Sequence, residues 1–193
     1  ANNNVGVGYL ALYANTTGAE NVAVGSEALD ANTTGAENVA VGYGSLSNAT
    51  TASYNTAVGK SSLGSNTTGA SNTAFGKSAL AANTTAPNNV AVGSGAGDAL
   101  TTGGYNVAIG TNALSTATTT TANVAVGERA LEDCTGEQNT ALGAHTLRDN
   151  TSGNANVAVG YFALGVNTTG DRNTAVGYGA LDANTTANYN VAM

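Results

Sequence analysis

The sequence is short of the residues on which most enzymes and nucleic-acid-binding proteins depend. Charged residues make up 9% of its 193 residues, and it has one His, one Cys, one Pro, one Met and no Trp. A single Cys excludes an intramolecular disulfide and a zinc site built on cysteines. With only 5 Lys and Arg and a net charge of -7, the chain lacks the cationic surface that nucleic acid requires. No apolar run approaches the roughly 18 residues of a membrane span, so we expect no membrane insertion.

What the sequence has instead is a repeat. Asn followed by a short apolar stretch recurs every 17 residues from Asn4 to Asn190, with a single step of 16 between Asn123 and Asn139. The unit reads N-[VT]-A-[VILF]-G-x-x-A-L-x-x-N-T-T-G-x-x, and we number its positions 1 to 17 from this Asn. Such a unit is too short for a helical hairpin, which needs about 30 residues or more. The period therefore predicts a β-structure that winds once per unit.

Each unit has the features of two short β segments joined by turns. Positions 1 to 5, as in Asn21–Gly25, predict the first strand, and positions 7 to 10, as in Glu27–Asp30, predict the second. Gly at position 5 ends the first strand, and Asn-Thr-Thr-Gly at Asn32–Gly35 is typical of a turn. We therefore predict an all-β parallel β-solenoid of about 11 coils of 17 residues, forming one repeat array over residues 1–193. We also expect the chain to be a piece of a longer protein.

Alternation along the two segments predicts which side chains face the interior. Position 9 is Leu in ten of eleven units, whereas position 10 varies, so Leu is expected to point inward. On the first strand we expect positions 2 and 4 to point inward as well, because they are Val, Thr or larger aliphatic residues. Leu114 and Ile109 are therefore predicted core residues.

Position 3 then points outward, yet it is Ala in every unit except the first, which has Gly6. A size limit on an outward face predicts close approach by another surface, and the alternative is that Ala merely fits a flat, narrow roll. The candidate chain–chain interface, most readily threefold, consists of Ala23, Ala40, Ala57, Ala74, Ala91, Ala108, Ala125, Ala141, Ala158 and Ala175.

The repeat resembles two families through Asn55–Gly59, Asn139–Gly143 and Asn173–Gly177, which read N-T-A-V-G, N-T-A-L-G and N-T-A-V-G. It is similar to the head repeats of YadA-like trimeric autotransporter adhesins, N-S-x-A-I-G. It is more similar to the N-T-A-[VIL]-G arrays of bacteriophage tail fibres and related bacterial surface proteins. The resemblance covers the whole chain and implies a left-handed β-roll, a homotrimer with chains side by side, and an adhesive or fibre role. It also implies an extracellular location, on a virion tail fibre or a bacterial cell surface, and a carbohydrate or protein receptor.

Two sets of side chains are candidates for binding. Exposed Tyr anchors sugars and proteins efficiently, although Tyr beside a turn also serves to cover a core. Stacked Thr at the strand spacing orders water on a flat face, which suggests ice binding. The candidate ligand contacts at position 6 are Tyr9, Tyr43, Tyr161 and Tyr178, and a second column at position 17 has Tyr54, Tyr105 and Tyr189. The candidate ice-binding pairs are Thr16, Thr17, Thr33, Thr34, Thr67, Thr68, Thr84, Thr85, Thr168, Thr169, Thr185 and Thr186.

The sequence contains no recognisable catalytic, metal or cofactor site. His145 has no Ser or Cys nucleophile at a recognisable spacing, so we expect a surface His. Cys134 falls in the shortened unit and is expected to be a buried thiol, with an interchain disulfide as the alternative. The carboxylates near it lack the nonapeptide of calcium-binding β-rolls and predict a solvated acidic patch. They are Glu128, Glu132, Asp133 and Glu137.

These observations favour a non-enzymatic role. The leading hypothesis is a structural and adhesive segment of a trimeric phage tail fibre or bacterial surface adhesin, a rigid spacer that also offers surface for a receptor. The first alternative is an ice-binding solenoid that uses the Thr pairs. The second is a subunit of an extracellular filament, because open coil ends favour stacking of solenoids end to end.

Overall fold

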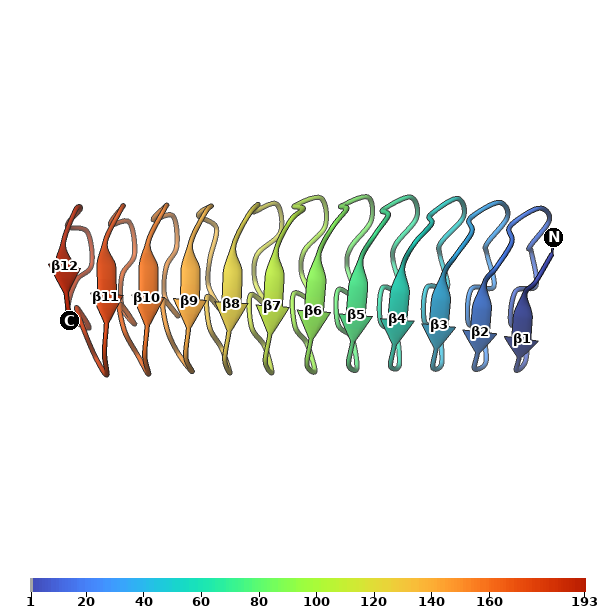
Figure 1. Cartoon of the computed structure of the whole chain (residues 1–193), viewed down its shortest axis with the longest axis horizontal. Coiled ribbons are helices and arrows are strands. Elements are labelled where there is room, and N and C mark those ends of the chain that lie inside the picture. Colours follow the sequence, from blue (N-terminus) through green and yellow to red (C-terminus); the bar gives the residue numbers. More distant parts are fainter. Residues whose placement is uncertain (1) are drawn as a thin grey trace.

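A computed structural model of the chain describes residues 2–193 as one elongated solenoid, with the two termini at opposite ends (Figure 1). Twelve short parallel strands, one per coil, form a single sheet in sequence order, and the described residues contain no helix. The predicted all-β parallel solenoid with 17-residue coils is thus confirmed. The strands are β1 (Val5–Val7), β2 (Val22–Val24), β3 (Val39–Val41), β4 (Thr56–Val58), β5 (Thr73–Phe75), β6 (Val90–Val92), β7 (Val107–Ile109), β8 (Val124–Val126), β9 (Thr140–Leu142), β10 (Val157–Val159), β11 (Thr174–Val176) and β12 (Val191–Ala192).

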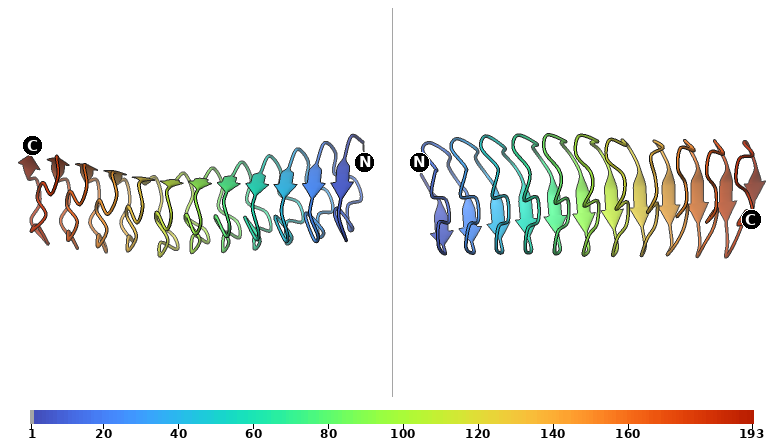
Figure 2. Two further views of the ribbon diagram at one scale, coloured as in Figure 1. Left: turned by 90° about the horizontal axis from the view of Figure 1, so that it is seen from below. Right: turned by 180° about the vertical axis from the view of Figure 1, so that it is seen from behind.

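The strands stack in register, so equivalent positions of successive units form straight columns. Ala23 of β2 pairs with Ala40 of β3, for example, and Ala125 of β8 pairs with Ala141 of β9 across the shortened unit. The missing residue of that unit lies in a turn, and the ladder is therefore undisturbed. Each strand contacts only the strands before and after it, and the whole stack is gently bowed (Figure 2).

The second predicted strand is wrong: positions 7 to 10 form successive turns. Glu27 and Leu29 have φ of 59° and 51°, and the same left-handed backbone recurs at positions 7 and 9 of the other coils. The amide of Ala28 donates to the carbonyl of Gly25 within this segment, whereas the amide of Leu29 donates to Ser45 in the next coil. The segment is therefore bonded to its neighbouring coils, but its backbone is not extended.

The core of the solenoid is a column of Leu packed against Ala. Leu114 at position 9 is fully buried, as predicted, and it belongs to one hydrophobic cluster with Ala113 at position 8 and Ala108 at position 3. An ideal Cβ placed on Gly6 would lie 3.7 Å from Cδ1 of Leu12, which shows how closely the strand approaches the Leu column of the same coil. Only a small side chain fits between them.

This narrow interior overturns the predicted orientation of the first strand. Ala108 is 1% exposed whereas Ile109 is 37% exposed, so positions 2 and 4 point outward and position 3 points inward. The side chain at position 3 is limited in size, as predicted, but the turn segment of the same chain imposes this limit and a neighbouring chain does not. The predicted interface along this column is therefore wrong. Its residues line the interior instead: Ala23, Ala40, Ala57, Ala74, Ala91, Ala108, Ala125, Ala141, Ala158 and Ala175.

Glycine at position 5 is required by both conformation and stacking. Gly25 has a φ of 138°, a region that side chains rarely enter, and an added Cβ would lie 2.5 Å from the carbonyl oxygen of Gly42 in the next coil. The strand therefore ends at this residue, as predicted, and the coils can stack closely there.

A column of buried Asn at position 1 joins each strand to the turn that closes the same unit, a role that the sequence analysis missed. Asn55 donates from Nδ2 to the carbonyl of Gly69, 3.0 Å away, and its backbone amide donates to Oδ1 of Asn38 at 3.0 Å. A second column at position 12 behaves similarly, since Nδ2 of Asn66 donates to Gly69 at 2.9 Å. The identity of Asn in all twelve copies of position 1 was the available signal.

Candidate functional surfaces

The outer face of the sheet is an uncharged, mostly apolar strip. Position 4 is Val, Ile, Leu, Phe or Met in every coil, position 2 is Val or Thr, and neither position carries a charge. Twelve strands spaced about 4.8 Å apart extend the strip over about 50 Å. Its most exposed members within the stack include Val7, Val24, Phe75, Val92, Ile109, Leu142, Val157 and Val176.

The strip is unusual because the inner face of the same sheet is apolar too. A sheet that faces water on one side alternates apolar and polar residues, whereas strands that are apolar on both sides are typical of sheets covered on both sides. Contiguous apolar surface of this kind usually marks contact with another macromolecule. The apolar side chains that remain exposed on the sheet are therefore those at positions 2 and 4, and not the Ala column at position 3.

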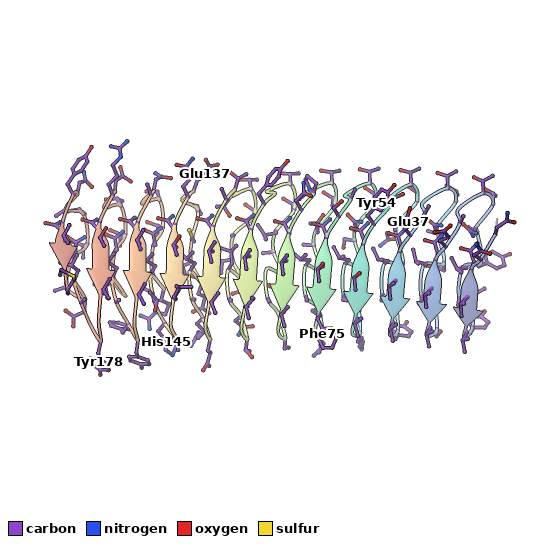
Figure 3. The ribbon with its side chains drawn as sticks, in the orientation of Figure 1. Glu37, Tyr54, Phe75, Glu137, His145 and Tyr178 are labelled. Atoms are coloured by element: carbon purple, nitrogen blue, oxygen red, sulfur yellow. The ribbon has the colours of Figure 1, made fainter. Side chains whose placement is uncertain are left out.

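The tyrosines predicted to contact ligands lie along one edge of the sheet, just after the strands end. Tyr178 and His145 mark this edge in Figure 3, and Tyr54 marks the opposite one. All four position-6 tyrosines are exposed, so they do not serve to cover the core. Toward the C-terminal end the rings of Tyr161 and Tyr178 stack with centroids 5.5 Å apart, and His145 meets Tyr161 edge-on at 5.7 Å.

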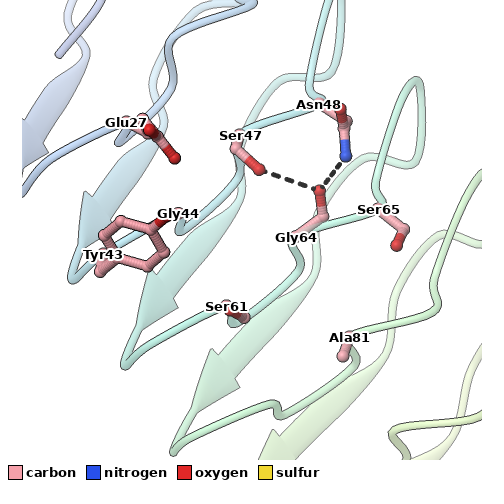
Figure 4. Close-up of a pocket in the computed structure, with 9 residues that line it drawn as sticks. All are labelled: Glu27, Tyr43, Gly44, Ser47, Asn48, Ser61, Gly64, Ser65 and Ala81. Atoms are coloured by element: carbon pink, nitrogen blue, oxygen red, sulfur yellow. Dashed lines mark hydrogen bonds between the residues drawn. The ribbon is translucent and has the colours of Figure 1, made fainter. Parts of the chain in front are cut away.

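A shallow hollow opens beside Tyr43 on the same edge (Figure 4). Ser47 and Asn48 donate from their side chains to the carbonyl of Gly64, at 3.3 and 2.7 Å. Hydrogen bonding to the Glu27 carboxylate, and the negative charge of that group, raise the pKa of Tyr43 above its usual value. The lining residues are Glu27, Tyr43, Gly44, Ser47, Asn48, Ser61, Gly64, Ser65 and Ala81.

The Thr pairs lie in a turn and do not form two equivalent rows. Thr33 at position 13 donates its hydroxyl to the carbonyl of Thr50 in the next coil at 3.0 Å, and Thr16, Thr67, Thr84 and Thr168 do the same. Position 14 forms the column that is exposed throughout: Thr17, Thr34, Thr68, Thr85, Thr169 and Thr186. One such column offers less ordered hydroxyl surface than the paired ladder that ice binding would use.

The remaining candidates are structural or solvated groups. Cys134 is buried and free, as the main hypothesis predicted, and desolvation by burial raises the pKa of its thiol to about 11. Arg129 pairs with Glu132 at 2.8 Å on the surface. Within residues 2–193 no cluster of His, Cys, Asp or Glu has the composition of a metal site. The same residues include no helix long and apolar enough to cross a membrane.

No protein-family model, no curated protein and no solved structure matches this chain.

Proposed function

We propose that this chain is a structural and adhesive segment of an extracellular fibre, on a phage tail or a bacterial surface, in which three parallel chains pack through their sheet faces. The observation that carries the proposal is the apolar strip along β1 to β12. The solenoid supplies a rigid spacer, and the tyrosine edge remains available to a receptor.

The strip favours lengthwise association of identical chains. Its position 4 column is apolar along the full length of the stack and neither column carries a charged residue, so a partner of the same length and axis buries all of the strip at once. Burial stabilises by about 25 cal/mol for each Å² of apolar surface, and a strip about 50 Å long therefore offers a substantial driving force. Parallel copies that present the same face to a common axis form a closed assembly. The number three comes from the resemblance of the repeat to trimeric fibres and adhesins.

The test is the mass of the protein in solution, measured by analytical ultracentrifugation. We expect the wild type to sediment with three times the 18.7 kDa of one chain. The paired substitution Val92→Lys with Ile109→Lys places charges on the strip, and it should yield folded single chains because these side chains do not enter the core.

The matched control is Ser94→Lys with Thr111→Lys, at position 6 of the same two coils, which should leave the mass unchanged. A wild type that stays monomeric at high concentration would contradict the proposal, as would assembly that survives the Val92 and Ile109 changes. Substituting Ala108 by Glu is not a useful test, because a charge in the core would unfold a single chain as well.

A further inference from the structure

We propose that the hollow beside Tyr43 binds one pyranose unit of an uncharged glycan. This inference rests on the adhesive part of the function proposed above, but it requires no association of chains. The site spans four consecutive coils, from Glu27 to Ala81, and is already formed in a single solenoid.

The hollow exists because two glycines coincide in adjacent coils. Gly44 occupies position 7, where an added Cβ would have only Ser61 Oγ within reach, at 4.0 Å. Gly64 occupies position 10 of the following coil, where an added Cβ would lie 3.3 Å from the carbonyl of Ser61. Two side chains are therefore missing from the same spot on the surface. The equivalent neighbours of Tyr9 and Tyr161 at position 7 are Leu10 and Phe162, which leave no such opening.

The groups around the opening suit a sugar. The exposed ring of Tyr43 offers an apolar surface for the C–H face of a pyranose, and its hydroxyl lies near the Glu27 carboxylate. Hydrogen bonds from Ser47 and Asn48 to Gly64 hold these side chains in place, which leaves the Asn48 Oδ1 atom free to accept from a sugar hydroxyl.

The remaining wall adds further hydroxyl groups. Ser61 and Ser65 make no side-chain hydrogen bond within residues 2–193, so both hydroxyls are available to a ligand. Figure 4 shows them on the side of the hollow away from Glu27, so a sugar between the two walls meets polar groups from both. A small number of fixed polar groups beside an apolar surface is the usual composition of a small-molecule site.

The charge distribution favours a neutral ligand. Glu27 is the single charged residue in the lining, and it would repel a carboxylate or phosphate. The Lys60 ammonium lies over the Tyr43 ring, 5.7 Å from its centroid, and its positive charge offsets that of Glu27, so the surroundings of the hollow are close to neutral overall. The same Glu27 carboxylate is a strong acceptor for sugar hydroxyls.

The experiment is a nuclear magnetic resonance titration of the ¹⁵N-labelled chain with methyl glycosides of glucose, galactose, mannose and N-acetylglucosamine, and with methyl glucuronide as the charged probe. We expect at least one neutral glycoside to shift the amide signals of Tyr43, Asn48 and Ser61. Tyr43→Ala and Gly44→Gln should each weaken that binding at least tenfold. Gln is compatible with the backbone at position 7, since Glu27 and Ser61 have φ of 59° and 56° there.

The matched controls are Tyr178→Ala and Gly179→Gln, at the same positions of a later coil, where Gly179 has the same φ of 61° as Gly44. Both should bind like the wild type. The inference is overturned if no neutral glycoside shifts these signals, if only the glucuronide does, or if the controls lose binding equally. Titrating the Val92 and Ile109 variant separates the two proposals, because single chains should retain the sugar site whether or not the wild type assembles.

Discussion

Left-handed backbone at ordinary residues is the most unusual feature of this chain at the scale of single residues. Within residues 2–193, thirty non-glycine residues have positive φ, between 49° and 63°, and all of them fall at positions 7, 9 and 17 of the repeat. Each costs roughly 1–2 kcal/mol relative to right-handed backbone. Position 7 is Gly in three coils, at Gly44, Gly95 and Gly179, where this cost is removed.

Relief of this cost predicts a stabilising substitution. Ser78 at position 7 has a φ of 58° and no side-chain hydrogen bond within residues 2–193, so Ser78→Gly removes strain without losing a hydrogen bond. The greater flexibility of Gly in the unfolded chain offsets part of the gain, and we expect a net stabilisation of about 0.5–1 kcal/mol. Urea denaturation measures the difference.

The same change at position 6 provides the control. Ser94 does not have positive φ, so Ser94→Gly should destabilise by about 0.5–1 kcal/mol through the unfolded state alone. Two substitutions with the same sign would show that the left-handed backbone at Ser78 carries no strain.

The orientation of individual residues was only partly predictable from the sequence. Leu114 faces inward as predicted. The prediction was possible because Leu recurs at position 9 while the neighbouring position 10 varies. Ile109 does not, since hydrophobicity alone favours placing Ile inside and Ala outside. The width of the coil determines which residue of the strand faces inward. The coil is narrow because residues such as Leu114 adopt left-handed backbone, and this conformation is not evident from residue type.

At the scale of elements, the hydrogen bonds of the two Asn columns join the coils in an interior that is too narrow for a large apolar core. The position 1 column is continuous, whereas position 12 is Ala49, Leu100, Ala117 and Cys134 in four coils. The Oδ1 atoms of Asn32 and Asn83, which are followed in the column by Ala49 and Leu100, are left buried without a partner, and so is that of Asn66, although Asn83 follows it.

The continuity of the first column predicts a larger effect of substitution there. Asn55→Ala leaves the backbone amide of Asn72 without its acceptor in the core, and an unpaired buried donor costs about 1–3 kcal/mol. The carbonyl of Gly69 also loses one of its two side-chain donors. Asn66→Ala removes a bond to the same carbonyl at a position where other coils tolerate Ala, so it should cost about half as much. Thermal unfolding of both variants makes the comparison, and equal losses would mean that the two columns are equivalent.

The repeat was sufficient to predict the number, order and register of the coils, since Asn at position 1 recurs in phase throughout. It did not predict how each coil closes. The turn residues at positions 7 to 10, as in Glu27–Asp30, alternate between apolar and polar side chains, as the residues of a strand do. The hydrogen bonds that distinguish these turns from a strand involve the backbone alone, so side-chain types do not reveal them.

At the scale of the whole molecule, the reactivity of Cys134, which is buried in the eighth coil, measures whether the stack is folded. Its pKa of about 11, raised from an ordinary value of 9.0 by burial, lowers the thiolate fraction at pH 8 about a hundredfold. We expect alkylation by iodoacetamide at pH 8 to be slower than in urea by at least that factor.

The same thiol predicts a dependence of stability on pH. Because the folded pKa exceeds the unfolded one, its contribution is complete below about pH 9 and is lost as pH rises toward 11. Replacing Cys134 by Ala should remove this part of the loss between pH 9 and 11, as measured by urea midpoints. A variant with the same alkaline loss as the wild type would assign that loss to other groups.

The candidate surfaces depend on contacts between coils, which the sequence of one repeat unit does not reveal. Exposure of Tyr43 was predictable from its position after the strand. The hollow beside it was not, because it needs Gly44 and Gly64 to meet across two coils. The apolar strip was misassigned for a related reason: the inward or outward sense of Val92 and its equivalents depends on what lies across the coil.

In-register stacking also determines how this protein can change in size. Each coil contacts only its two neighbours, and every coil presents the same Asn, Gly and strand positions to the next. Deletion or duplication of one whole unit therefore brings together surfaces that already fit. Its length can vary in steps of 17 residues, each worth about 4.8 Å, without remodelling any other coil. Gain or loss of whole units therefore changes the reach of the solenoid independently of its fold.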